Sequence, residues 1–183
     1  MRHRLITATT AIIMAFTTGA SATDISQDSA NNIRDTLNHL LPKDIAKRAP
    51  VTVTPAGSRY EIGYDFSKLL AQFKKTDFDI KGLKPFKIFA TPQDNGLWDL
   101  EGNNNLNVTG HFIGPDKKRS DFTYSVADMV FNSVFDPAIS YFRSGDFSAK
   151  ELKFISSTDT EVIKASFGNM IYKLTSAESV TAG

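Results

Sequence analysis

The sequence predicts an α+β fold: an antiparallel β-meander of roughly seven to nine strands, with an N-terminal helix and a short helix over residues 66–74 packed on it. A β-sandwich without helices is the alternative. The main observation is that residues 97–113 alternate: apart from the terminal Leu97 and Ile113, the large apolar side chains are at even positions and the odd positions are polar. A second is the helical spacing of apolar residues before Pro42.

The first 22 residues have the features of a secretory signal peptide. Arg2 and Arg4 precede an apolar run, and the small residues Ala20, Ser21 and Ala22 form a cleavage pattern. The run is too short for a membrane span, which needs about 20 apolar residues. We therefore expect cleavage after Ala22, a mature chain without a transmembrane span, and export to the periplasm of a bacterium.

The composition of the chain narrows its compartment and partners. It has no cysteine, which excludes disulfides, thiolate metal sites and a cysteine nucleophile. Cleavage would remove two of the 21 basic residues and none of the 20 acidic ones, so the net charge becomes about −1. A nearly neutral chain has no long-range attraction to nucleic acid, and no nucleic-acid partner is expected.

Residues 23–174 are expected to form a single α+β domain, followed by a flexible tail over 175–183. A helix is expected over residues 23–41, capped by Asp28 or Ser29 and ended by Pro42. A further helical turn is expected over 43–48. The apolar positions at helical spacing are Ile33, Leu37, Leu40 and Leu41.

Residues 51–64 predict a β-hairpin. Apolar residues are odd before Pro55 and even after Ser58, so a four-residue loop over 55–58 would bring like faces together. This loop would oppose Val53 to Tyr60. The 66–74 helix follows, capped by Asp65 or Ser67, with its apolar residues Phe66, Leu69, Leu70 and Phe73 facing the sheet.

Even parity continues through residues 78–90, but Gly82 and Pro85 divide them into two short strands. The residues from Gly102 to Asn105 favour a reversal in the middle of 97–113, which makes that stretch a hairpin with a loop of three or five residues. Residues 114–119 form a charged turn.

Three further strand regions follow the charged turn. Residues 121–135 and 161–174 carry apolar groups at both parities, as strands buried on both faces or interrupted by a bulge do. Residues 149–155 predict another strand, with Leu152 and Phe154 inward. The last strand, from Ile163 to Leu174, is either paired on both sides or an edge open to association with a second copy or a partner.

The sequence contains little that indicates catalysis. It has no Gly-rich phosphate loop, HExxH or GxSxG motif, and only His39 and His111 remain after processing. Both histidines are expected to be ordinary surface residues. We therefore expect no catalytic residue, cofactor or metal ion, and a cryptic hydrolase is the weakest alternative.

Acidic side chains occur in two places without forming a recognised motif. Asp77 and Asp79 flank the start of a strand, where charge favours solubility. In the 97–113 stretch, alternate side chains lie about 7 Å apart, so their oxygens do not match a calcium loop. Those oxygens belong to Asp99, Glu101, Asn103 and Asn105.

Large aromatic residues are the remaining candidates for a binding site. They fill the core or, in part, line an apolar groove for a lipid chain, and the sequence leaves both interpretations open. The candidates are Trp98, Phe112, Phe122, Tyr124, Phe131, Phe135, Tyr141 and Phe142.

Three segments carry a resemblance: PVTVTPAGSRYEIGYDFSKLL, PFKIFATPQDNGLWDL and FDPAISYFRSGDFSAKELKF. They resemble exported proteins of alphaproteobacteria that are themselves similar to AsmA-like envelope proteins, which are built from long antiparallel β-meanders. The resemblance covers roughly residues 50–155 and contains no catalytic motif. It implies an envelope location and a lipid-facing concavity. Because such proteins are much longer, it also implies that the chain is part of a longer one.

Together these observations favour a non-enzymatic periplasmic protein that binds a lipid or another apolar ligand, or an envelope protein. A purely structural or assembly module of the cell envelope is the competing interpretation.

Overall fold

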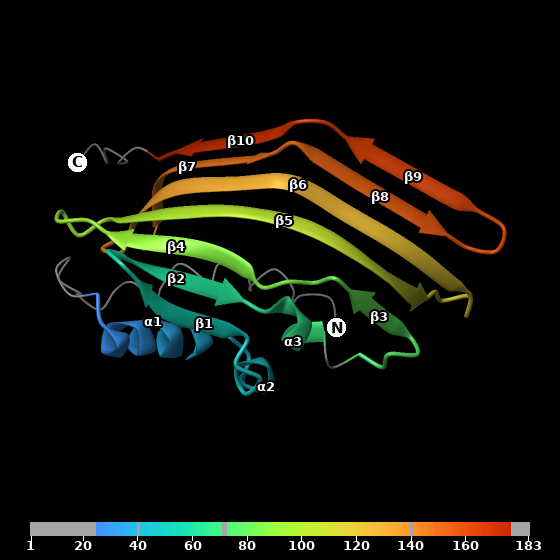
Figure 1. The fold of residues 1–183 in the computed structure, drawn as a ribbon, viewed down its shortest axis with the longest axis horizontal. Helices are drawn as coiled ribbons and strands as arrows, with labels where there is room; N and C mark the ends of the chain where they lie inside the picture. The colour runs from blue at the N-terminus through green and yellow to red at the C-terminus, as the bar shows by residue number, and fades with distance from the viewer. Residues whose placement is uncertain (1–24, 40, 71–72, 140, 177–183) are drawn as a thin grey trace, which may run out of the picture.

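The computed structural model describes residues 25–39, 41–70, 73–139 and 141–176, so the expected signal peptide and most of the expected tail lie outside the described residues. Its strands form one open antiparallel sheet with a few helices beside it, which fits a mainly-β α+β fold (Figure 1). The strands are β1 (Val51–Ala56), β2 (Arg59–Tyr64), β3 (Phe78–Lys81), β4 (Phe86–Pro92), β5 (Trp98–Ile113), β6 (Arg119–Asp136), β7 (Tyr141–Ala149), β8 (Glu151–Ser157), β9 (Val162–Phe167) and β10 (Met170–Thr175).

The two long strands β5 and β6 run through the whole sheet, which has two halves along their length. The proximal half contains the start of β5 and the end of β6, and the distal half contains the end of β5 and the start of β6. In the proximal half the order is β1-β2-β4-β5-β6-β7-β10. In the distal half β3 pairs with the end of β5, β8 pairs with the start of β6, and β9 pairs with β8. Every pairing is between antiparallel strands.

The helices belong mainly to the proximal half. They are α1 (Gln27–His39), α2 (Lys43–Ala46) and α3 (Phe66–Leu70), and α1 packs on β1 (Figure 1). The cap of α1 is Ser26, whose Oγ accepts a hydrogen bond from the Ser29 N–H at 3.1 Å, and not the expected Asp28 or Ser29. No helix in the described part is long and apolar enough to cross a membrane.

The helix expected over residues 66–74 is shorter than expected, and of its four apolar residues Phe73 lies beyond the helix and packs against Phe78 of β3. In the described residues α3 spans five positions and buries none of them, and Phe66 remains 43% exposed. Its start is as predicted, because Asp65 Oδ1 accepts a hydrogen bond from the Ser67 N–H at 3.0 Å. A helix this short has too small an apolar stripe to cover a sheet face.

The alternation in 97–113 is confirmed, but the hairpin expected there is wrong, because β5 is one continuous strand. Two asparagines replace missing strand partners, one where β4 leaves the ladder and one at an irregularity in β6. The Asn104 side-chain amide donates to the Lys87 carbonyl and accepts from the Lys87 N–H, both at 2.8 Å. Asn105 Oδ1 accepts from the Asp128 N–H at 2.8 Å. Asparagine favours turns for the same ability to bond backbone groups.

Bulges explain the mixed parities in the later strands. An extra residue near Asp128, whose φ is +47°, changes the phase of β6, so its inward residues are even before this point and odd after it. A second irregularity, beside Phe135, changes the phase of β7. Strand β7, which precedes the expected 149–155 strand, was not predicted, because its sequence has no regular alternation of apolar and polar residues.

The first hairpin forms with a different register. Its turn is Gly57 and Ser58 alone, and Val53 opposes Ile62 where Tyr60 was expected. Gly57 has a φ of +69°, a conformation in which glycine lacks the steric cost of a side chain, and this permits the tighter reversal. The shift is by two residues, so every side chain stays on its predicted face.

The hydrophobic core lies between α1 and one face of the proximal half, which we call the inner face. Its buried residues come from α1, β1, β2, β4, β5 and β6, and Phe135 and Tyr60 are fully buried. The same face continues into the distal half, where Val108 and Val126 are buried. The opposite, outer face carries the odd-numbered polar residues of β5.

Candidate functional site

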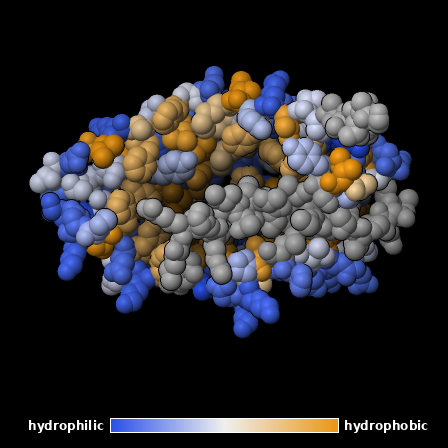
Figure 2. All heavy atoms as spheres, turned by 180° about the vertical axis from the view of Figure 1, so that it is seen from behind, coloured by the Kyte–Doolittle hydropathy of each residue, from blue (hydrophilic) through white to orange (hydrophobic). Residues whose placement is uncertain are grey.

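The inner face is a continuous apolar surface along the sheet. In the distal half it consists of side chains that oppose one another across β3, β5, β6, β8 and β9. Figure 2 shows that the molecule is hollowed on the side seen there and that hydrophobic residues line the hollow. The inward positions of the distal half include Phe78, Ile80, Leu106, Val108, Phe112, Phe122, Tyr124, Leu152, Phe154 and Phe167.

The two halves of the inner face differ in how far other elements of the structure cover them. In the proximal half α1 lies on the sheet, and the central side chains are excluded from solvent. In the distal half Phe112 is 38% exposed and Phe167 is 58% exposed, although both are on the inner face. The proximal half is therefore core, whereas the distal half leaves apolar area available to a ligand.

Four rings form an aromatic cluster in the distal half: Phe73, Phe78, Phe112 and Phe122. The ring centroids of Phe78 and Phe122 are 6.4 Å apart, those of Phe112 and Phe122 are 6.3 Å apart, and those of Phe73 and Phe78 are 5.5 Å apart. These separations are typical of packed aromatic pairs. The cluster joins β3, β5 and β6 with the segment after α3.

A glycine makes the centre of the aromatic cluster possible. Gly110 on β5 lies directly opposite Phe122, and a Cβ placed there would be 2.8 Å from the Phe122 ring. The same Cβ would collide with the Asp79 carbonyl oxygen on β3. The absence of a side chain thus lets β3 approach β5 and lets the Phe122 ring occupy the inner face.

The eight predicted aromatic residues are divided by the structure. Trp98 and Phe135 are core residues, and the rings of Trp98 and Tyr60 lie 6.1 Å apart. Tyr141 is 50% exposed at the start of β7, outside the aromatic cluster. Phe131 and Phe142 pack beside the proximal core, and Phe112, Phe122 and Tyr124 belong to the distal inner face.

Phe73 and Phe78 were not among the predicted site residues. The sequence signal that could have identified Phe78 is its even parity, which it shares with Ile80 and which places both residues on one face. What the sequence does not contain is the pairing of β3 with the far end of β5, which brings Phe78 opposite Phe112.

Two buried hydroxyl groups on the inner face of the proximal half have no hydrogen-bond partner among the described residues. They belong to Tyr64, at the end of β2, and Ser133, opposite Leu100. Burial raises the pKa of Tyr64 above its ordinary value, so its hydroxyl stays protonated. An unsatisfied buried hydroxyl costs about 1–3 kcal/mol, so each of these groups lowers the stability of the proximal half.

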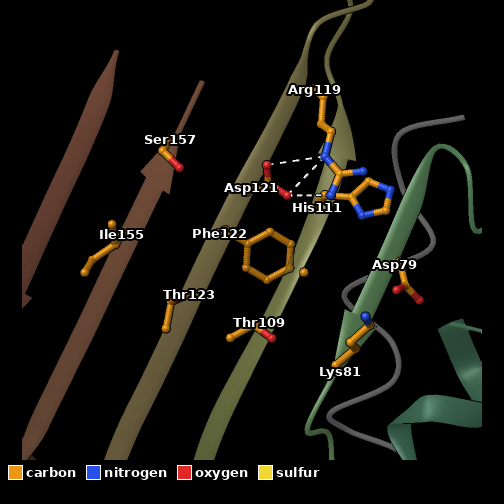
Figure 3. Close-up of a pocket in the computed structure, with 11 residues that line it drawn as sticks. Asp79, Lys81, Thr109, His111, Arg119, Asp121, Phe122, Thr123, Ile155 and Ser157 are labelled. Carbon is orange, nitrogen blue, oxygen red and sulfur yellow. Dashed lines mark hydrogen bonds and ion pairs between the residues drawn. The ribbon is translucent and has the colours of Figure 1, made fainter. Parts of the chain in front are cut away.

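The outer face has a shallow depression of about 300 Å³ at the distal end (Figure 3). One row of its lining residues crosses four strands, because Asp79 opposes His111, His111 opposes Asp121, and Asp121 opposes Ser157. Arg119 Nη2 lies 2.7 Å from Asp121 Oδ1. Hydrogen bonding from Arg119 lowers the pKa of the Asp121 carboxyl, and that pairing raises the pKa of Arg119.

The positions of the residues in this row limit the chemistry that the depression can support. Ser157 is two strands away from His111, or roughly 10 Å, so its hydroxyl lacks an imidazole to remove its proton. His111 lies on the outer face between Asp79 and Asp121 and is partly exposed. The described residues contain no group of three or more acidic or histidine side chains suited to a metal ion.

The acidic residues of β5 have local partners on the outer face. Gln93 Nε2 donates to Asp99 Oδ2 at 2.6 Å, and Arg59 Nη1 lies 3.4 Å from Glu101 Oε2. The carboxylates of Asp99 and Glu101 therefore bind neighbouring segments of the protein and help to hold β5 in place.

Comparisons with protein-family models, curated proteins and solved structures find no match to this chain.

Proposed function

We propose that this chain is a non-enzymatic protein of the bacterial periplasm that binds the acyl chain of a lipid on the distal inner face. The observation that carries the proposal is the exposed aromatic surface of that half, where Phe112 is 38% and Phe73 is 50% exposed. The same sheet face in the proximal half is closed by α1. Export, and hence the location, rests on the signal peptide expected in the first 22 residues.

The chemistry of the distal inner face favours an acyl chain over a charged or planar ligand. Its side chains are aromatic and aliphatic, and they follow the long strands β5 and β6 in a strip. The charged residues of the same strands, such as Asp121 and Arg119, lie on the outer face or at the turn. A flexible apolar chain lying along such a strip removes apolar area from water without burying a charge.

The test uses a fatty acid carrying an environment-sensitive fluorophore, titrated into the purified protein. Phe122→Ser removes the central ring of the aromatic cluster, and we expect its affinity to fall about tenfold or more. Phe112→Ser is a second variant, in case Phe122→Ser weakens folding. Tyr141→Ser is the matched control, because Tyr141 is an exposed aromatic residue outside the cluster.

Native mass spectrometry of protein purified gently from its host would identify a retained lipid by mass. Saturable binding that Phe112→Ser and Phe122→Ser weaken and Tyr141→Ser does not would support the proposal. Equal binding by all four proteins, or no binding by any, would contradict it.

The second candidate function is a structural or assembly module of the cell envelope. The exposed strand edge formed by β9 and β10 favours it, because an edge with apolar side chains is suited to pairing with another chain. A stoichiometric protein partner in the native mass spectrum, in place of a lipid, would favour this alternative.

A further inference from the structure

Strands β9 and β10 form one long edge of the sheet (Figure 1). Among the described strands, β9 pairs only with β8, and β10 pairs only with β7. From this edge we propose that two copies of the chain associate by antiparallel pairing, with β9 of each copy against β10 of the other. This inference concerns a different surface from the proposed lipid site and does not depend on it.

The edge lacks the usual protection against pairing. Five large apolar side chains along it are 51–70% exposed, and they occur on both faces of the sheet. Charged residues within the two strands are limited to Lys164 and Lys173. An edge of this kind has unpaired backbone groups and apolar area to cover. Val162 and Ile171 are on the outer face, and Ile163, Phe167 and Tyr172 are on the inner face.

The edge is symmetric about its break. Strand β9 has six residues, strand β10 has six residues, and Gly168 and Asn169 separate them. A two-fold axis between Gly168 and Asn169 would therefore pair the whole of β9 with the whole of β10 from the other copy. The break of one copy would then lie against the break of the other.

The phase of the side chains supports the same axis. Inward residues are odd in β9 and even in β10. Directly opposed residues in an antiparallel pair share a face, so like faces meet only if the axis falls between two residues, as it does here. The inner faces of the two copies would then be continuous. The inward pairs are Ile163 with the partner's Leu174, Ala165 with the partner's Tyr172, and Phe167 with the partner's Met170.

This register also determines which charged residues oppose one another. Lys164 would oppose the partner's Lys173 on the outer face, and symmetry repeats the pair. Like charges directly opposed weaken strand pairing. Asp146 offsets part of this repulsion, because its Oδ1 lies 3.9 Å from Lys173 Nζ. The association should therefore strengthen with added salt, which screens exposed charges.

Charge reversal at Lys164 tests the register by sedimentation velocity over a range of protein concentrations. Lys164→Glu places a carboxylate opposite the partner's Lys173 at both symmetric positions. We expect dimerisation to become roughly tenfold tighter, because two pairs change from repulsion to attraction. The double variant Lys164→Glu/Lys173→Glu opposes like charges again and should lose that gain.

Lys118→Glu is the matched control, since it makes the same change of charge in the exposed β5–β6 turn. The proposal is supported if the wild-type protein dimerises, Lys164→Glu tightens the dimer and Lys118→Glu does not. It is overturned if the wild type stays monomeric, or if the single, double and control variants dimerise equally. Fatty-acid binding measured on the same samples separates this result from the proposed function.

Discussion

Replacing Trp98 by alanine tests the division of the inner face into a closed half and an open half. Trp98 is 3% exposed, and its ring lies 6.1 Å from that of Tyr60 within the core. A buried tryptophan side chain removes about 200 Å² from water, which at about 25 cal/mol per Å² gives an upper limit of about 5 kcal/mol. Core Phe and Trp to Ala substitutions cost about 3–5 kcal/mol, and we expect a value in this range.

The assay is urea unfolding followed by far-UV circular dichroism. With a slope of about 2 kcal/mol per M, a loss of about 4 kcal/mol would lower the midpoint by about 2 M. Asn103→Ala is the control in the same strand, because Asn103 is exposed on the outer face. Phe112→Ala should cost less than Trp98→Ala, since Phe112 is 38% exposed. Equal midpoints for Trp98→Ala and Asn103→Ala would refute the assignment of faces.

Three further predictions concern separate parts of the chain. Intact mass of material recovered from the periplasm should correspond to cleavage after Ala22, and a membrane-bound product that retains Met1 would contradict this. Gly110→Ala should lower the melting temperature measured by circular dichroism, because its Cβ would collide with the Asp79 carbonyl oxygen. Hydrogen bonding from Arg143 lowers the pKa of Asp136, so this pair should stabilise the fold above about pH 4, the usual aspartate range, and be lost as pH falls further. Melting temperatures should show Asp136→Asn less stable than wild type near pH 7, with a gap that narrows in acid.

The sequence predicted side-chain faces better than it predicted connections. Alternation in 97–113 placed Trp98, Leu100 and Val108 on one buried face correctly, because a period of two is a local property of a strand. The same stretch was assigned a hairpin because asparagine and glycine often occupy turns. Asn104 uses its amide instead to bond both backbone groups of Lys87, a residue 17 positions away. That use depends on where β4 ends, which is not a local property.

The candidate site was predictable to a similar extent. Parity identified Phe112 as sharing a face with Trp98, and the structure agrees. It did not assign Phe122 and Tyr124, because residues 121–135 carry apolar groups at both parities. Parity does not reveal which part of a face another element covers. Trp98 is buried in a core that includes residues of α1, far away in sequence, and the aromatic cluster depends on the pairing of β3 with β5. Both are long-range contacts, so core and candidate groove had the same local pattern.

The strand from Ile163 to Leu174 illustrates how a local pattern acquires meaning from topology. Apolar residues at both parities indicated either burial on both faces or a bulge. The structure places the break at Gly168 and Asn169 and leaves both strands at the edge, with Ile171 70% exposed. In a central strand this pattern would be satisfied by neighbours on each side. At an edge it exposes backbone groups and apolar side chains together, and the phase change at Gly168 and Asn169 is the one that a symmetric pairing of two copies requires.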